Sequence, residues 1–513
     1  MDKNFYITTP IYYPSAKPHM GHAYSSIIAD FFARFKRIDG FDVHFLTGTD
    51  EHGLKIQRAA ENMNIEPLDF CDQISQTFRD LSKTLNLSNT DFIRTTEERH
   101  KKTVQHIWSE LEKNDDIYLS KYSGWYSVSD EAYYSEDEII DKDGKKISET
   151  SGSLVEWIEE ESYFFRLSKW QDKLLDYYEK NPDFISPKSR KNEVVSFVKG
   201  GLKDLSISRK AFSWGIKVPG NSDHVIYVWL DALTNYISAL NYPDTKNVLF
   251  KKFWPASVHL IGKDILRFHA VYWPAFLMAA KIPLPKKIYG HGWILSGEEK
   301  MSKSRGNILD PIDIIKTYGL DPLRYYLIKE VSFGNDGNIS QDRLEDCINS
   351  DLANNYGNLC QRVTAFAEKN CSSKVPKIEN FTKDDLVMLN RFTENLEIIR
   401  QEIDNQNINF YISFIVSALF EANKYFNDQE PWKKKDDKNR LNTIVYTSLE
   451  MIRKISFMLY PIIPDSIDRA LKIFDLSSKD INLESIAFHD FLKAGDDINK
   501  IDILFKKIEK KND

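Results

Sequence analysis

The stretch from Asn4 to Asp30 constrains the fold more than any other part of the chain. It begins with a run rich in Tyr, Ile and Thr, Phe5 to Tyr13, which is typical of a buried strand. A turn with two prolines follows, and then apolar residues at spacings of three and four predict a helix. Strand, turn and helix in this order are how a doubly wound parallel sheet begins, with ligands at the carboxyl ends of its strands.

Two histidines mark the start of this helix. His19 and His22 are three residues apart, hence on the same side of the first turn, and Gly21 lets a ligand approach the backbone. Backbone N–H groups without helical partners and the helix dipole both favour anions at this point. A satisfied pair of helix-terminal histidines would give the same pattern, so this motif alone leaves both interpretations open.

A second motif, Lys300-Met301-Ser302-Lys303-Ser304, follows a strand-like run at 287–295 and is flanked by Gly297 and Gly306. Two lysines in a small, flexible loop can close over a polyphosphate as point charges. For a Lys/Ser run taken alone, a solvated surface loop is the simpler interpretation.

Both motifs together, in this order and far apart, resemble the two signatures of class I aminoacyl-tRNA synthetases, and the chain around them is similar to the methionyl-tRNA synthetase family. Further segments that carry the resemblance are Gly48-Thr49-Asp50-Glu51-His52-Gly53, Tyr227-Val228-Trp229-Leu230-Asp231-Ala232, Gly262-Lys263-Asp264 and Glu430-Pro431-Trp432. The resemblance extends over nearly the whole length. It implies a methionine-tRNA ligase that activates methionine with ATP to methionyl-adenylate plus pyrophosphate and transfers it to tRNA(Met), the initiator tRNA included.

The implied fold class is α/β, a Rossmann-like doubly wound parallel sheet with a connective insertion, followed by an all-α helical bundle. The expected regions are 1–117 (first half of the nucleotide-binding fold), 118–217 (insertion), 218–296 (second half), 297–340 (lysine loop and stem-contact region) and 341–513 (anticodon-binding domain). At 513 residues, about three domains are expected.

Local patterns predict the elements within these regions. Predicted strands after the first are 41–50, 225–230, 258–261 and 287–295, and predicted helices are 231–240 and 264–280. Asp310 and Asp321 each precede a proline, which predicts two helix starts capped by aspartate. Residues 382–385 form a capping box before an apolar stripe, which indicates the helix bundle.

Activation of an amino acid with ATP requires that the protein position both substrates and neutralise the charge of the phosphates. By the resemblance, the catalytic residues are His19 and His22, which donate to the phosphates, with Lys300 and Lys303 on the departing pyrophosphate. The implied ATP-binding residues are His19, Gly21, His22, Asp264, Gly290, His291, Gly292, Lys300 and Lys303. Asp264 taken alone would equally be a helix N-cap. ATP is expected to bind as its Mg²⁺ complex.

The resemblance also implies a methionine site. Its residues are Ile11, Tyr13, Asp50, Trp229, Ala232, Leu233, Tyr236, Ile265 and His269. Asp50 would bind the amino group, and the others would line a slot for the thioether, which packs well against aromatic edges. Apart from the resemblance, Asp50 is equally a helix N-cap, Trp229 a core residue of a strand, and His269 a satisfied core histidine.

Three residues of the C-terminal third are implied to contact the CAU anticodon: Asn358, Arg362 and Trp432. Asn358 and Arg362 are four residues apart, hence on one helical face, and Trp432 follows a proline. Bases of a single-stranded loop are read by stacking on aromatic rings and by hydrogen bonds. The alternative for Trp432 is a packing residue at the end of the bundle.

Many members of the family carry a zinc knuckle in the insertion. The matching positions here hold Ser127, Asp130, Ser148 and Ser151. Serine is a poor ligand for a metal that prefers thiolate or imidazole. We therefore predict no structural zinc, and an insertion held together by aromatic packing alone.

Composition limits the remaining choices. The cysteines, Cys71, Cys347, Cys360 and Cys371, have no metal-like spacing, which indicates free thiols in a reducing cytoplasm. A net charge of −7 argues against a nonspecific nucleic-acid binder but allows a local basic face. No run approaches the ~20 apolar residues of a membrane span, and a monomer is expected because no dimerising barrel follows the bundle.

Two other functions stay open at this point. One is a class I synthetase for another apolar amino acid, against which the slot and the anticodon positions argue. The other is an inactive tRNA-binding paralogue, against which the intact histidines and lysines of the two motifs argue.

Overall fold

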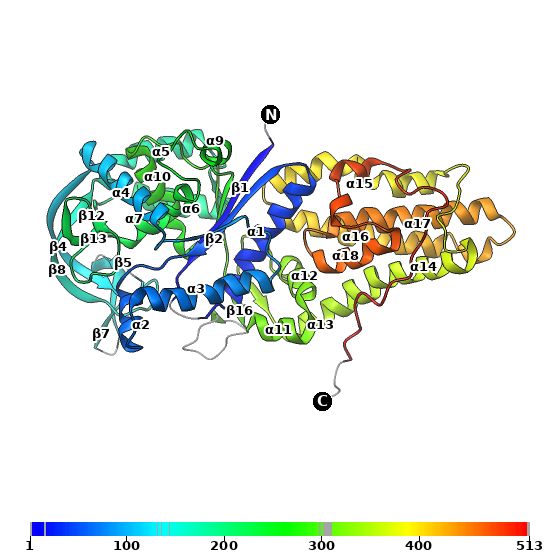
Figure 1. The fold of residues 1–513 in the computed structure, drawn as a ribbon, viewed down its shortest axis with the longest axis horizontal. Coiled ribbons are helices and arrows are strands. Elements are labelled where there is room, and N and C mark those ends of the chain that lie inside the picture. The colour runs from blue at the N-terminus through cyan, green and yellow to red at the C-terminus, as the bar shows by residue number, and fades with distance from the viewer. Residues whose placement is uncertain are drawn as a thin grey trace. The chain divides into compact units, whose positions relative to one another are not determined.

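The computed structural model describes residues 3–14, 17–130, 132–134, 136–142, 144–296, 299–300 and 310–509 (Figure 1). The chain forms two compact units. The first, called here the sheet unit, contains Asn4–Pro18 and Val43–His291. The second, called here the helical unit, contains Met1–Lys3, His19–Asp42 and Gly292–Asp513.

A parallel sheet forms the centre of the sheet unit. Its strand order is β3 (Asp91–Arg94), β2 (Asp42–Thr49), β1 (Asn4–Tyr12), β14 (Val258–Gly262), β15 (Ile288–His291) and β9 (Ile185–Ser186). The pairs β2–β3, β1–β14, β14–β15 and β15–β9 are parallel. From β1 the chain runs outward through β2 to β3, and from β14 it runs the other way to β15, with the earlier strand β9 at the far edge. This order confirms the doubly wound prediction and puts a ligand-binding switch point between β1 and β14.

Helices and smaller sheets complete the sheet unit. The helices are α2 (Leu54–Asn62), α3 (Pro67–Thr84), α4 (Glu98–Lys113), α5 (Gln171–Lys180), α6 (Lys188–Lys199), α7 (Val228–Leu233), α8 (Asn235–Ser238), α9 (Val248–Phe253) and α10 (Trp273–Ala279). Antiparallel strands β4 (Ile117–Ser127), β5 (Ala132–Tyr134), β8 (Glu156–Phe165) and β10 (Leu205–Ser206) form one sheet, and β6 (Ile139–Lys142) pairs with β7 (Lys145–Ser148). Fully buried aromatic residues such as Trp108 and Trp273 fill the core.

The predicted strand at 225–230 is wrong. Strand β13 (Asn221–Ile226) ends earlier and pairs antiparallel with β11 (Ser208–Arg209) and β12 (Lys217–Val218), outside the parallel sheet. Helix α7 begins directly after this strand. The carbonyl of Tyr227 accepts the N–H of Asp231 at 3.1 Å, which is a hydrogen bond of helical spacing. Trp229 therefore lies on a helix, and the apolar run that suggested one strand serves two elements.

The predicted strand at 287–295 is also two strands. β15 ends at His291, and β16 (Ile294–Ser296) pairs with β18 (Gly337–Ile339) and with β17 (Glu299–Lys300) in a different sheet. The break lies at Gly292, where a Cβ would come within 2.1 Å of the carbonyl oxygen of Asn335. The backbones of Gly292 and Asn335 approach each other closely between the two strands. Hydrophobic periodicity in the sequence does not predict such an approach.

The helical unit confirms the predicted bundle (Figure 1). Its helices are α1 (Met20–Ile38), α11 (Pro311–Tyr318), α12 (Leu320–Glu330), α13 (Gln341–Cys347), a π-helix (Ile348–Gly357), α14 (Asn358–Cys371), α15 (Lys383–Asp404), α16 (Ile408–Asp428), α17 (Lys438–Leu459) and α18 (Pro464–Leu471). Helices α15, α16 and α17 contact one another, and α14 and α18 contact α17. Among the described helices, none is both long and apolar enough to cross a membrane.

One of the two predicted aspartate caps is present. Asp310 accepts the N–H of Ile312 at 2.8 Å and caps α11. Asp321 does not cap α12, which begins one residue earlier after Gly319. Its buried carboxylate instead accepts the N–H of Ser466, at the start of α18, at 2.5 Å. A contact with a distant helix therefore takes the place of the local cap.

The capping box of α15 is confirmed and extended. Asp385 accepts both the N–H and the hydroxyl of Thr382, at 2.7 and 2.9 Å. Its fully buried carboxylate also accepts two N–H groups of Arg440 at 2.6 and 3.0 Å and the hydroxyl of Tyr425. Burial acts to raise the pKa of Asp385, but these donors outweigh it and hold the pKa below its usual value. One carboxylate thus joins α15, α16 and α17.

We predict that Asp385→Ala destabilises the chain by about 3–5 kcal/mol, because it leaves Arg440 without its acid and removes the cap. Asp384→Ala is the matched control. Asp384 is the exposed neighbour, with one bond from Gln429 at 3.3 Å, and its loss should change stability by roughly 0.5 kcal/mol or less. Chemical denaturation followed by circular dichroism measures both. A loss of stability for Asp385→Ala that is no larger than the loss for Asp384→Ala would contradict the prediction.

Candidate functional site

Asp50 follows the end of β2, at the carboxyl edge of the parallel sheet. It is buried, and its N–H donates to the carbonyl of Tyr12 at the end of the neighbouring strand β1 at 3.0 Å. Helix α2 begins at Leu54 with Gly53 in the capping position and no side-chain cap. The capping alternative for Asp50 is therefore wrong, and its carboxylate lies at the strand ends where ligands bind in such sheets.

Most residues predicted to line the thioether slot belong to one large apolar core of the sheet unit or pack against it. Leu233 and Tyr236 belong to one buried apolar cluster, and the partly exposed side chains packed against it include Ile11, Tyr13, Trp229 and Ile265. Ala232 is buried beside Leu233 on α7. The Trp229 ring stacks on Phe268, with centroids 3.7 Å apart and an interplanar angle of 5°. Partly exposed rings at the margin of a core are suited to hold an apolar ligand.

One polar pair lies within this apolar lining. Tyr236 Oη is 2.7 Å from His269 Nε2, and His269 Nδ1 is 3.0 Å from the carbonyl oxygen of Ile265. Because a carbonyl only accepts, Nδ1 carries the proton and Nε2 accepts from the tyrosine. Burial lowers the pKa of His269 to about 4, so the ring is neutral at neutral pH.

The predicted nucleotide residues of the sheet unit converge at the ends of β14 and β15. A Cβ on Gly262 would lie 2.6 Å from Asp264 Oδ1 and 4.0 Å from His291 Cε1, so these side chains surround the end of β14. Asp264 is exposed in a 3₁₀ turn, Lys263–Ile265, that has no side-chain cap, and the capping alternative is wrong here too. A Cβ on Gly290 would be 3.4 Å from Leu266 Cδ1, which is an ordinary van der Waals contact.

The histidine pair lies in the helical unit, at the first turn of α1. His19 Nδ1 accepts the N–H of Gly21 and His22 Nδ1 accepts the N–H of His19, each at 3.1 Å. The rings lie with centroids 3.8 Å apart. Since each Nδ1 accepts, each ring carries its proton on Nε2 and can donate from that atom. The capping interpretation of the pair is thus correct, and the caps also orient two donors.

The lysine motif is described only in part. The backbone of Lys300 pairs with Leu295 of β16, and α1 contacts β16 within the helical unit. Strand β16 therefore contacts both the helix that carries the histidine pair and the strand that carries the first lysine. The side chain of Lys300 and the whole of Lys303 lie outside the described residues. Gly292 is fixed beside Asn335 at the start of this segment.

The three predicted anticodon residues lie in the helical unit. Arg362 on α14 packs over the ring of Phe426 at 5.5 Å and donates to Asn427 Oδ1 at 2.6 Å. Trp432, which is 40% exposed, packs edge-on against the same Phe426 ring with centroids 6.2 Å apart. Asn358 is one turn before Arg362 on α14. Phe426 and Asn427, which the sequence reasoning did not single out, thus connect two of the predicted residues.

The four knuckle positions in the insertion hold a hydrogen-bonded cluster. Ser127 Oγ and Ser148 Oγ accept the N–H groups of Asp130 and Ser151, each at 3.3 Å. The donors to the Asp130 carboxylate are Ser151 Oγ at 2.5 Å, Ser153 Oγ at 2.8 Å and Tyr134 Oη at 2.7 Å. Hydroxyls are poor zinc ligands, and among the described residues no group of three or more His, Cys, Asp or Glu could hold a metal. The absence of a structural zinc stays a prediction. The expectation of aromatic packing alone is wrong, because this polar cluster also closes the insertion.

Sequence reasoning missed a buried group beside the slot. Asp231, on α7 between Leu230 and Ala232, accepts from His52 and from His100. Two of these residues stand inside segments that carried the family resemblance, but the spacing gave no sign that they meet.

Comparisons with known proteins identify the family to which this chain is similar. The model of class I tRNA synthetases (M) matches residues 5–364, and the model of the anticodon binding domain of methionyl tRNA ligase matches residues 375–513. The methionine–tRNA ligase of Brucella suis is 52% identical over 473 residues, 92% of each chain, and that of Rickettsia conorii is 50% identical over 513 residues, 99% of this chain and 100% of the relative. A structure of Mycobacterium tuberculosis methionyl-tRNA synthetase in complex with methionyl-adenylate is 44% identical, covers 98% of this chain and 99% of that one, and has a TM-score of 0.95.

We predict that His269 makes stability depend on pH. Its folded pKa of about 4 is below the ordinary value of 6.5, so between these values the unfolded chain binds a proton that the folded chain does not. Stability should therefore fall as pH falls from 6.5 toward 4, by at most about 1.4 kcal/mol per pH unit for this proton. His269→Asn, which does not titrate, should reduce that slope in urea denaturation at several pH values. Identical slopes would contradict the prediction.

Proposed function

The chain belongs to the methionyl-tRNA synthetase family of class I aminoacyl-tRNA synthetases, and we infer that it ligates methionine to tRNA at the expense of ATP. The observation that carries this inference is the match of the two family models, over residues 5–364 and 375–513. The apolar residues proposed to line the methionine site, which pack against one buried core, support it. In the first step, a methionine carboxylate oxygen bonds to the α-phosphorus of ATP and pyrophosphate leaves. In the second, a ribose hydroxyl of the tRNA attacks the acyl carbon and AMP leaves.

The residues of the first step have separate tasks. His19 and His22 donate from Nε2 to phosphate oxygens, since their Nδ1 atoms are used in the helix cap. Lys300 and Lys303 neutralise the departing pyrophosphate as point charges. Asp264 accepts from the ribose, and the exposed position of its carboxylate beside Gly262 supports this role.

Gly290, His291 and Gly292 form the adenine side of the proposed site. Gly290 and His291 belong to the end of β15, at the carboxyl edge of the sheet where ligands bind in such folds. Magnesium enters as the counterion of the ATP phosphates and needs no carboxylate cluster of its own.

Methionine is held by charge at one end and by apolar contact at the other. Asp50 accepts from the ammonium group, and Trp229 and Tyr13 enclose the side chain, with the sulfur near the Tyr236–His269 pair. That pair is neutral, since the tyrosine donates to a histidine whose pKa is lowered by burial. A neutral polar group can meet a thioether without the cost of burying a charge.

Anticodon recognition belongs to the helical unit. Trp432 offers an exposed ring for base stacking, and Arg362 and Asn358 offer donors on one face of α14. We propose the CAU anticodon of tRNA(Met), the initiator included, as the partner of this surface. A monomeric state and a cytoplasmic location stay predictions from the sequence.

We predict that the purified chain exchanges labelled pyrophosphate into ATP with methionine and far less with leucine or valine, whose branched side chains lack the flexibility and the thioether of methionine. All proteinogenic amino acids are assayed in turn. Strong exchange with leucine or valine would support a synthetase for another apolar amino acid. Exchange with none would support an inactive tRNA-binding paralogue.

We predict that Trp432→Ala lowers kcat/KM for tRNA by about tenfold or more, because the loss of a base stack costs roughly 1–3 kcal/mol. Methionine-dependent pyrophosphate exchange should keep its wild-type rate. Phe420→Ala, which removes another exposed aromatic ring of the bundle, is the control and should leave charging unchanged. A loss of exchange together with charging would contradict the assignment of Trp432 to the anticodon.

A further inference from the structure

A buried carboxylate lies between two imidazoles beside the proposed methionine slot. Asp231 is fully buried on α7, and its two oxygens lie 2.7 Å from His52 Nδ1 and 2.7 Å from His100 Nε2. His100 Nδ1 is also 2.8 Å from Ser238 Oγ on α8. The group is called here the His52–Asp231–His100 clasp.

The clasp joins the two halves of the slot. His52 is two residues after Asp50, the proposed ligand of the methionine ammonium group. Asp231 is two residues after Trp229 and directly before Ala232, which line the apolar side. A single carboxylate thus fixes the distance between the part of the slot that binds the charge and the part that binds the side chain.

The residue between Asp50 and His52 is anchored on the other side. Glu51 is fully buried. The donors to its carboxylate are Thr49 Oγ1 at 2.7 Å, Arg94 Nε at 2.7 Å and Thr96 Oγ1 at 2.5 Å. In addition, Tyr13 Oη donates to the carbonyl of His52 at 2.9 Å. Glu51 and His52, the two residues that follow Asp50, are therefore both held in place by hydrogen bonds.

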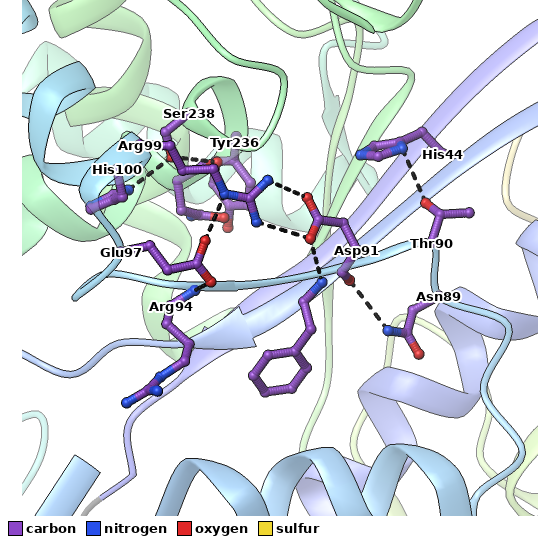
Figure 2. A network of polar contacts seen from close by, with 12 residues as sticks. His44, Asn89, Thr90, Asp91, Arg94, Glu97, Arg99, His100, Tyr236 and Ser238 are labelled. Carbon is purple, nitrogen blue, oxygen red and sulfur yellow. Dashed lines mark hydrogen bonds and ion pairs between the residues drawn. The ribbon is translucent and has the colours of Figure 1, made fainter. Parts of the chain in front are cut away.

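The third member of the clasp is fixed by the start of α4 (Figure 2). Arg99 donates to both carboxylate oxygens of Asp91 on β3, at 2.8 and 3.0 Å, and to Glu97 at 2.6 Å. His100 is the next residue, and Figure 2 shows its hydrogen bond to Ser238 behind this ion pair. The sheet and α4 together thus set the position of the imidazole that faces Asp231.

The protonation of the clasp follows from its partners. Burial acts to raise the pKa of Asp231, but His52 and His100 outweigh it, so its pKa is lowered and the carboxylate is ionised at neutral pH. An ionised carboxylate only accepts, so His52 donates from Nδ1 and His100 from Nε2. Removal of the charge would leave one of these buried donors without its acceptor.

We propose that Asp231 is a positioning residue for methionine, holding Asp50 and the Trp229 side of the slot at the separation that the amino acid requires through His52 and His100. This proposal rests on the proposed function and deepens it. The ATP-binding residues are not part of the clasp, so the loss should appear in methionine binding and not in ATP binding.

The test compares Asp231→Asn with wild type in pyrophosphate exchange and in calorimetric titration with methionine alone. We expect KM and Kd for methionine to rise by about tenfold to a hundredfold, since a displacement of about 1 Å costs that much, with KM for ATP unchanged. Asp116→Asn is the matched control. Asp116 is another buried carboxylate of the sheet unit, bound by Lys169 at 2.7 Å, and its loss should leave KM for methionine unchanged.

Two pairs of variants keep the test decisive if Asp231→Asn folds poorly. His100→Gln keeps an N–H donor near the place of Nε2 and should retain most methionine affinity, whereas His100→Leu should not. By the same reasoning, His52→Asn should retain more affinity than His52→Leu.

Unchanged methionine affinity in Asp231→Asn, or equal losses in the conservative and apolar variants, would overturn the proposal. So would a parallel rise of KM for ATP. If wild type itself shows no exchange with methionine, the proposed function fails instead, and the two failures are thereby distinguished.

Discussion

The parallel pairing of β1 with β14 is the interaction on which the proposed site depends. Ile7 lies opposite Val258, and Thr8 Oγ1 is 2.9 Å from His259 Nδ1 although 251 positions separate them. This pairing brings the end of the first strand, with Tyr13, beside segments from the second half of the fold. Since the chain leaves β1 and β14 toward opposite sides, the strand ends between them are open to a ligand. The proposed slot therefore depends on this register.

Buried carboxylates then determine which helices meet. Asp30 on α1 accepts from Arg34 at 2.7 Å and from Arg324 of α12 at 2.6 Å, and Arg324 also donates to the carbonyl of Ile462 at 2.8 Å. Asp385 does the same for three helices of the bundle. Apolar surfaces would tolerate a sliding of one helix on another, but a buried charge is costly in any arrangement that separates it from its partner. We infer that these groups fix α1, and with it the two histidines, relative to the bundle.

The sequence predicted those elements whose signals are local. The first strand, α1 and the bundle helices follow from periodicity, and the caps at Asp310 and 382–385 follow from residue type. The failures at 287–295 and at Asp321 share one cause, since each depends on a partner distant in the chain. At Gly292, for example, the partner is the backbone of Asn335, and no property of the run 287–295 reveals it. The run at 225–230 failed because it is divided between a short antiparallel strand and a helix start. The capping alternatives at Asp50 and Asp264 failed because the strand ends, not the helix starts, determine where these side chains lie.

The histidines show how environment gives one residue type different tasks. His19 and His22 are partly exposed, and their Nδ1 atoms accept backbone N–H groups, so each presents an Nε2 donor. His52 and His100 are buried against a carboxylate and donate inward, which makes them structural supports. His269 is buried against a carbonyl and a hydroxyl, and burial keeps it neutral. The sequence places the residues, but only the acceptor or donor that each ring meets decides whether it faces a phosphate, fixes a backbone or borders an apolar ligand.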